Sequence, residues 1–247
     1  MSGHSKWSTI KRKKGAIDAK KGKIFSRIVK EISMAVKEGG TEPEANPRLR
    51  LAIQNARGAN MPKDNIDRAI KRADKDGADL QEVTFEGYAP NGIAVFIECL
   101  TDNNQRTVSL VRSIFNKRGG NMGTNGSLSF IFDRKGVFTV KKNDLDPDAF
   151  QLEIIDAGVE DCEVEDEVFI ITTALEDFGS MQKKLDEMSI EVENAELQRV
   201  PNSTKALPIA EARKILKMIE EFEDLDDVQN VYHNLELTSE VMAVMEE

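Results

Sequence analysis

The sequence predicts a multidomain protein with an N-terminal three-helix domain followed by two α+β domains, one inserted in the other. Two patterns predict this fold class. Apolar residues recur at three- and four-residue steps up to about residue 78, and beyond that point strand-like runs alternate with helical ones. Charge is also divided along the chain. Residues 1–30 hold ten Lys or Arg and one acid, in a chain whose net charge is −10. A basic N-terminal end on an acidic body is typical of proteins that bind polyanions locally.

The N-terminal part is predicted to comprise a basic arm over residues 1–22 and a helical domain over 23–78. The first helix is expected from Lys23 to about Glu38 and ends at a Gly pair. A second helix begins at Asn46-Pro47, because Asn is a favoured N-cap and Pro a favoured first helical residue. A third begins at Pro62. Three short amphipathic helices can bury their apolar faces only against one another, which predicts a small helical domain.

The middle part changes to a strand period. The elements expected there are strands over 83–88 and 93–100, joined by an Ala-Pro-Asn-Gly turn, a helix over 103–118 and a strand over 128–132. The second strand is apolar almost throughout, which indicates a central position in its sheet. This set lacks a second covering helix.

Residues 136–200 follow the order β-α-β-β-α-β, which is the ferredoxin-like pattern. Within this segment, residues 144–196 contain 18 acids and two bases, Lys183 and Lys184. A helix over 208–222 and a strand over 228–235 follow, and they can complete the middle sheet. We therefore expect a discontinuous α+β domain, 79–134 with 203–247, and an inserted acidic domain over 135–202. Both are expected to be ferredoxin-like.

The candidate functional residues are those suited to nucleic acid, because Lys and Arg release condensed counterions when they meet phosphates. A tryptophan in the arm can also stack on an unpaired base. The expected nucleic-acid-binding residues are Lys6, Trp7, Lys11, Arg12, Lys13, Lys14, Lys20, Lys21, Lys23, Arg27, Arg48, Arg50, Arg68, Lys71, Arg72, Arg106, Lys117 and Arg118. The alternatives are a solubilising tail for the arm and ordinary solvated faces for the helices.

Two further segments leave their roles open. The Gly-rich segment 118–127 follows a predicted helix and lacks Gly-Lys-Ser/Thr, so we expect no nucleotide site there. It is either a second nucleic-acid contact or a structural helix end. The acidic hairpin 160–167 is either a solvated turn or a docking surface for the basic arm or a basic protein.

Several function classes are not expected. The two cysteines, Cys99 and Cys162, are far apart and no CxxC occurs, which argues against a disulfide framework or a zinc site. With two histidines and no nucleophile–base motif, we expect no enzyme, catalytic residue, metal, cofactor or small-molecule substrate. No apolar run reaches the roughly 18 residues of a membrane helix, so we expect a cytoplasmic protein without a membrane partner. The oligomeric state stays open.

Several motifs together resemble the YebC family: Gly3-His4-Ser5-Lys6-Trp7, Gly22-Lys23-Ile24-Phe25, Asn46-Pro47-Arg48-Leu49-Arg50, Asn60-Met61-Pro62, Phe85-Glu86-Gly87-Tyr88 and the Arg118–Ser127 loop. The resemblance runs nearly end to end. It implies a three-domain bacterial protein that binds DNA as a transcriptional regulator. Mitochondrial relatives resemble translational activators, and some bacterial members are linked to ribosomes and to synthesis of proline-rich stretches. The expected function is therefore a DNA-binding transcriptional regulatory protein, with an RNA- or ribosome-binding translation factor as the alternative.

Overall fold

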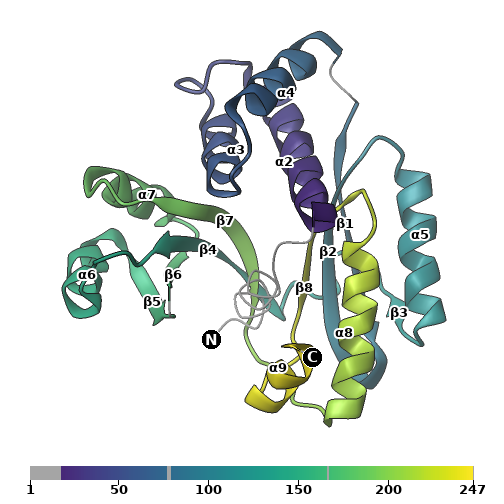
Figure 1. Ribbon diagram of the computed structural model, residues 1–247. Coiled ribbons are helices and arrows are strands. Elements are labelled where there is room, and N and C mark those ends of the chain that lie inside the picture. Colours follow the sequence, from purple (N-terminus) through teal and green to yellow (C-terminus); the bar gives the residue numbers. More distant parts are fainter. Residues whose placement is uncertain (1–17, 77–78, 166, 247) are drawn as a thin grey trace. The chain divides into compact units, whose positions relative to one another are not determined.

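The computed structural model describes residues 18–76, 79–165 and 167–246 (Figure 1). The described residues divide into two compact units. The first unit contains residues 18–30, 79–133 and 200–246, and the second contains 31–76 and 134–199. The division falls inside the first helix, so each unit combines part of the N-terminal region with one of the two sheets.

Three helices open the described chain: α2 (Asp18–Gly39), α3 (Pro47–Gly58) and α4 (Lys63–Asp76). The Asn46 side chain accepts a hydrogen bond from the Leu49 amide, so the predicted cap of α3 is confirmed. The same side chain donates to the Ala35 carbonyl in α2, which ties the two helices together. The first helix begins five residues before the predicted start, because Asp18-Ala19-Lys20-Lys21 are all compatible with an N-terminal helical turn.

The first unit contains an antiparallel sheet in the order β3-β1-β2-β8. Its strands are β1 (Gln81–Ala89), β2 (Ile93–Thr101), β3 (Asn121–Met122) and β8 (Val228–His233), with a short 3-10 turn, η1 (Pro90–Gly92), between β1 and β2. In that turn Asn91 has φ 61°, as the predicted tight turn requires. β2 lies between β1 and β8, which agrees with its apolar sequence.

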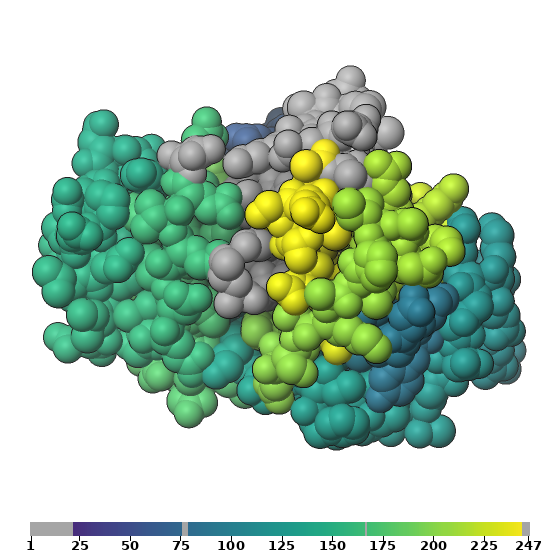
Figure 2. All heavy atoms as spheres, turned by 90° about the horizontal axis from the view of Figure 1, so that it is seen from below, coloured from purple at the N-terminus to yellow at the C-terminus, as the bar shows by residue number. Residues whose placement is uncertain are grey.

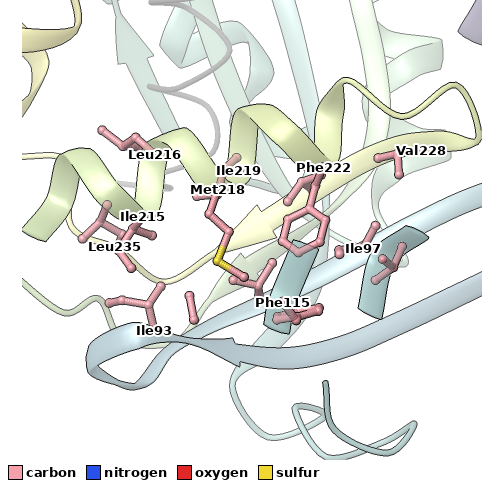
Figure 3. Close-up of a cluster of buried hydrophobic side chains, with 14 of the residues drawn as sticks. Ile93, Ile97, Phe115, Ile215, Leu216, Met218, Ile219, Phe222, Val228 and Leu235 are labelled. Carbon is pink, nitrogen blue, oxygen red and sulfur yellow. The ribbon is translucent and has the colours of Figure 1, made fainter. Parts of the chain in front are cut away.

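Two helices, α5 (Asn104–Lys117) and α8 (Ile209–Glu223), cover one face of this sheet. Ile215, Met218, Ile219 and Phe222 of α8 point toward β2 and α5, and the rings of Phe115 and Phe222 lie 4.8 Å apart (Figure 3). The C-terminal helix α9 (Ser239–Glu246) lies beside α8 and adds the buried Val241 to this core (Figure 2).

The predicted strand over 128–132 is wrong for nearly all its length. Residues 124–131 form successive turns, and a regular strand begins only at Phe132. Leu128 and Phe132 are buried, while Phe130 between them is 71% exposed, an alternation that imitates a strand. The two-residue β3 takes the sheet position beside β1 instead. The turns form because the backbone amides here find a side-chain acceptor in β1, described below.

The second unit contains an antiparallel-paired sheet in the order β5-β6-β4-β7. The elements follow the predicted β-α-β-β-α-β order: β4 (Phe132–Lys141), α6 (Pro147–Ile154), β5 (Val159–Val164), β6 (Val168–Ala174), α7 (Phe178–Glu187) and β7 (Val192–Pro201), with a 3-10 turn, η2 (Ile155–Ala157), after α6. α6 and α7 bury one face of the sheet around Phe138, Phe150, Phe169 and Leu185. This strand order is that of a ferredoxin-like sheet.

Candidate nucleic-acid interface

The N-terminal candidates lie largely outside the described part of the chain. Lys6, Trp7, Lys11, Arg12, Lys13 and Lys14 fall there, and for Lys20 and Lys21 only the helical backbone of α2 is described. The candidates whose side chains are described begin at Lys23. In the first unit these candidates are Lys23, Arg27, Arg106, Lys117 and Arg118, and in the second unit they are Arg48, Arg50, Arg68, Lys71 and Arg72.

On α2, the candidates Lys23 and Arg27 share one face with Lys30, because spacings of four and three residues follow the helical repeat. That face contacts the connection between α8 and β8. Lys23 Nζ lies 2.5 Å from an Asp224 carboxylate oxygen, and Arg27 donates to the Glu223 carbonyl at 2.8 Å. Lys30 donates to Asp227 at 2.9 Å. These three cations therefore hold the N-terminal part of α2 against the rest of the first unit.

Arg106, at the start of α5, also binds the connection between α8 and β8. Its guanidinium donates to the Asp227 carboxylate at 2.7 Å and to Asp102 at 2.8 Å. Asp227 has a side chain only 7% exposed and also accepts from the Thr107 hydroxyl at 2.8 Å. Burial alone raises the pKa of Asp227, but hydrogen bonds from Arg106, Lys30 and Thr107 outweigh it and lower that pKa to about 2.

Lys117 and Arg118, at the end of α5, meet a carboxylate of α8. Arg118 donates through Nε to Glu221 at 2.9 Å and through a second nitrogen to the other oxygen of that carboxylate, so the pair is bidentate. Lys117 lies 3.7 Å from the same carboxylate. The Arg118 hydrogen bond lowers the pKa of Glu221 despite its partial burial. Arg118 therefore fastens α5 to α8.

In the second unit, Arg48 is also engaged within the protein. It donates to Glu31 at 2.7 Å and to Glu38 at 2.8 Å, both on α2. By contrast Arg50, two residues further along α3, is exposed and has no hydrogen-bond or ion-pair partner among the described residues. Arg57 lies seven residues later on the same side of α3 and is likewise exposed.

The third helix, α4, buries Ile66, Ala69 and Ala73 and exposes its opposite side. Lys71 and Arg72 are exposed there and have no partner among the described residues, whereas Arg68 donates to the Asp64 carbonyl and the Asn65 side chain of its own helix. The exposed acids Asp64, Asp67 and Asp74 are interspersed among these cations. This face offers Lys and Arg to phosphates, and the amide side chain on α4, that of Asn65, is half-buried and accepts from Arg68.

The basic helices are seated on the acidic domain by contacts that sequence patterns do not reveal. Asn55 of α3 donates to the Ala195 carbonyl of β7 at 2.8 Å and accepts from the Ala195 amide at 2.9 Å. The α3 backbone comes so close that a Cβ on Gly58 would lie 1.8 Å from the Glu193 carbonyl oxygen. An amide side chain on a helix carries no periodic signal, and only Gly58 hints at a close approach.

The Gly-rich segment proves to be organised around a buried acid. Glu86 of β1 is 4% exposed, and its carboxylate accepts from the amides of Gly126 and Leu128, each at 2.6 Å. The Glu86 carbonyl also accepts from the Gly123 amide at 2.7 Å. A lone Glu in a strand-like run gives no sign of this role, because its partners lie about 40 residues away.

The residues in the described part of the chain give little support for metal binding, membrane insertion or thiol reactivity. There, no cluster of three His, Cys, Asp or Glu residues could hold a metal ion. None of the helices described has the length and apolarity to cross a membrane. Burial raises the pKa of Cys99 to about 12 and that of Cys162 to about 11, so both thiols are protonated at neutral pH.

Comparison with known proteins identifies the family. Residues 5–76 match the TACO1/YebC N-terminal domain, and residues 80–235 match the TACO1/YebC second and third domains. A protein of Amoebophilus asiaticus is 52% identical over 95% of this chain and 98% of its own length, and one of Chlorobaculum parvum is 46% identical over the full length of both chains. Both are named probable transcriptional regulatory proteins.

A solved structure agrees with the fold. The crystal structure of a conserved hypothetical protein of Aquifex aeolicus has a TM-score of 0.81 and 41% sequence identity, covering 90% of this chain and 92% of that one. Fold, full-length sequence identity and the match of all three domains lead to one conclusion. The chain belongs to the TACO1/YebC family, in which the relatives from Amoebophilus asiaticus and Chlorobaculum parvum are named as regulators.

Proposed function

We propose that this protein is a nucleic-acid-binding regulator of gene expression, and specifically a DNA-binding transcriptional regulatory protein. The observation that carries this proposal is the division of its cations into two groups. Lys23, Arg27, Arg106 and Arg118 are bound to acceptors of their own unit, whereas Arg50, Lys71 and Arg72 are exposed without a partner among the described residues. Unpaired exposed cations are those that a phosphate backbone can engage at little cost.

The names of the relatives support regulation of transcription as the process. We propose DNA as the polyanion because transcriptional regulators act on DNA. The basic N-terminal residues, including Lys11–Lys14 and Lys20–Lys21, are proposed to add phosphate contacts of their own. We also propose a cytoplasmic location and no enzymatic activity. We propose that the basic N-terminal part contacts the polyanion, and that the acidic inserted domain supports the helices α3 and α4.

An RNA- or ribosome-binding translation factor is the second candidate. The specific observation in its favour is the exposed face of α4, where Lys71 and Arg72 suit phosphates and Asn65, the amide residue of the helix, is half-buried and bound by Arg68. Contacts of this kind do not distinguish DNA from RNA.

The test measures binding of the full chain to mixed genomic duplex fragments and to ribosomes over a series of salt concentrations. The variant Lys71→Ala/Arg72→Ala removes two exposed cations of α4. For its control, Lys183→Ala/Lys184→Ala removes two cations from the acidic domain of the same compact unit. We expect the α4 variant to flatten the slope of log affinity against log salt by roughly 2, since each phosphate contact contributes about 0.9. The control should leave the slope unchanged.

Three outcomes separate the candidates. Duplex binding with an α4-dependent salt slope, and no ribosome association, supports the DNA-binding regulator. Ribosome association that depends on the same cations, with weak duplex binding, assigns the protein to translation instead. Absence of binding to either polyanion overturns the proposal altogether.

A further inference from the structure

The outward face of α5 carries a line of polar side chains with no acid among them. Gln105, Ser109, Arg112 and Asn116 follow spacings of four, three and four residues, which align them along one side of a helix. All four are exposed, as is Ser113 beside them. The opposite side of α5 carries Thr107, Val111 and Phe115, which are buried.

The helix that presents this line is firmly held. Asn103 caps it by accepting from the Arg106 amide at 3.1 Å, and Thr107 donates to the buried Asp227 carboxylate. At its far end, Phe115 packs on Phe222 and Arg118 pairs with Glu221, so α8 supports the C-terminal end of α5. A site on a rigid helix holds its side chains in a fixed geometry before any ligand arrives.

The charge of this region differs from the rest of the protein. No Asp or Glu occurs from Asn103 to Phe132, although the whole chain has 44 acids in 247 residues. Arg106 and Arg118 are neutralised by Asp227 and Glu221. Arg112 is exposed and has no partner among the described residues. The α5 face is therefore weakly positive and free of the repelling acids found on α4.

The side-chain chemistry points to base edges rather than to phosphates alone. Gln and Asn can each donate to and accept from an adenine edge, Arg can donate twice to a guanine edge, and Ser can do either. The helix has 14 residues, so it is roughly 21 Å long, and the major groove of B-form DNA is wide enough for an α-helix. The deep, narrow major groove of A-form RNA is not.

We propose that α5 is a recognition helix that reads base edges in the major groove of duplex DNA through Gln105, Arg112 and Asn116. The inference rests on the proposed function and deepens it, because α5 supplies a sequence preference that phosphate contacts alone do not give. Ser109 has less freedom to read bases, because its hydroxyl already donates to the Gln105 carbonyl at 2.8 Å.

The experiment first selects duplexes from a random library with the wild-type protein. The affinities of the selected duplex and of a scrambled duplex of equal length are then compared for Arg112→Ala, Gln105→Ala and the control Lys217→Ala. Lys217 is an exposed cation of α8, on the same sheet face, without a partner among the residues described. All three substitutions lie on exposed helical surface and introduce Ala, which favours helix, so the fold is retained.

We expect Arg112→Ala and Gln105→Ala each to lower the selected-to-scrambled affinity ratio by about tenfold, while Lys217→Ala leaves the ratio unchanged. A selection without a consensus, or a ratio that the α5 variants do not alter, overturns the recognition helix but leaves the proposed function standing. Preferential selection of single-stranded RNA loops by the wild type, weakened by the α5 variants, would also overturn it. Failure of the wild type to bind any nucleic acid is the separate result that removes the proposed function.

Discussion

Lys30 of α2 and Asp227, immediately before β8, form an ion pair at 2.9 Å across 197 positions of sequence. The same ammonium group donates to the carbonyl oxygens of Asp226 at 2.9 Å and Leu100 at 3.2 Å. Its three N–H donors thus have three acceptors. Arg106 approaches Asp227 from α5, so this single carboxylate joins two helices and the ends of two strands.

Asp227→Asn should lower the free energy of unfolding by about 3 kcal/mol, because it leaves Lys30 and Arg106 facing a neutral amide that is itself a donor. The midpoint of denaturant unfolding, followed by circular dichroism, measures the change. Asp224→Asn is the matched control. The side chain of Asp224 is 73% exposed and, among the described residues, pairs only with Lys23, so its loss should change the midpoint little. Equal effects of the two variants would refute the central role of Asp227.

The low pKa of Asp227 predicts an acid-dependent loss of stability. Its pKa is about 2 in the folded protein and 3.8 ordinarily, so the folded state binds the proton less readily than the unfolded state. The stabilisation is therefore fully present above about pH 4 and is lost as the pH falls toward 2. Between pH 5 and pH 2, the free energy of unfolding should fall more steeply with decreasing pH for the wild type than for Asp227→Asn. Denaturant unfolding measured at a series of pH values gives this dependence. Parallel curves would assign the acid sensitivity to other carboxylates.

Gly58→Ala should destabilise the second unit by roughly 1–3 kcal/mol, because the new methyl group would overlap the Glu193 carbonyl oxygen and push α3 away from β7. Gly22→Ala on α2 makes a suitable comparison, since nothing lies within 4 Å of a Cβ at that position. That control is expected to be neutral or slightly stabilising, as Ala favours helix over Gly. Thermal unfolding of both variants gives the answer, and an unaffected Gly58→Ala would contradict the close approach.

Glu86→Ala should loosen the Gly-rich segment, because the amides of Gly126 and Leu128 would lose their acceptor in a partly buried position. We expect a loss of about 1–3 kcal/mol and faster hydrogen exchange at these two amides. Ser127→Ala should have a smaller effect, since the Ser127 hydroxyl lies 3.4 Å from the same carboxylate. Unchanged exchange in Glu86→Ala would show that the turns form without the carboxylate.

The sequence by itself determined the features that depend on neighbouring residues. Asn46-Pro47 begins α3, because the Asn46 side chain accepts from the amide three residues later. The apolar run of β2 likewise indicates a central strand. The order of elements in 136–200 followed from periodicity alone. These signals are local, because a cap, a turn or an amphipathic face is formed by residues within a few positions of one another.

Only the tertiary structure decided which polar groups form hydrogen bonds and ion pairs within the protein. The sequence pattern of 128–132 is that of a strand, but in the fold the Leu128 amide donates to Glu86 and the segment forms turns. Three cations that the sequence leaves without a partner are paired in the fold: Arg106 with Asp227, Arg118 with Glu221 and Lys23 with Asp224. These partners are separated by about 40 to 200 residues. A charge or an amide in sequence has no fixed partner, and the fold selects one by bringing distant groups within hydrogen-bond distance. That selection leaves the exposed residues of α3, α4 and α5 available for a ligand.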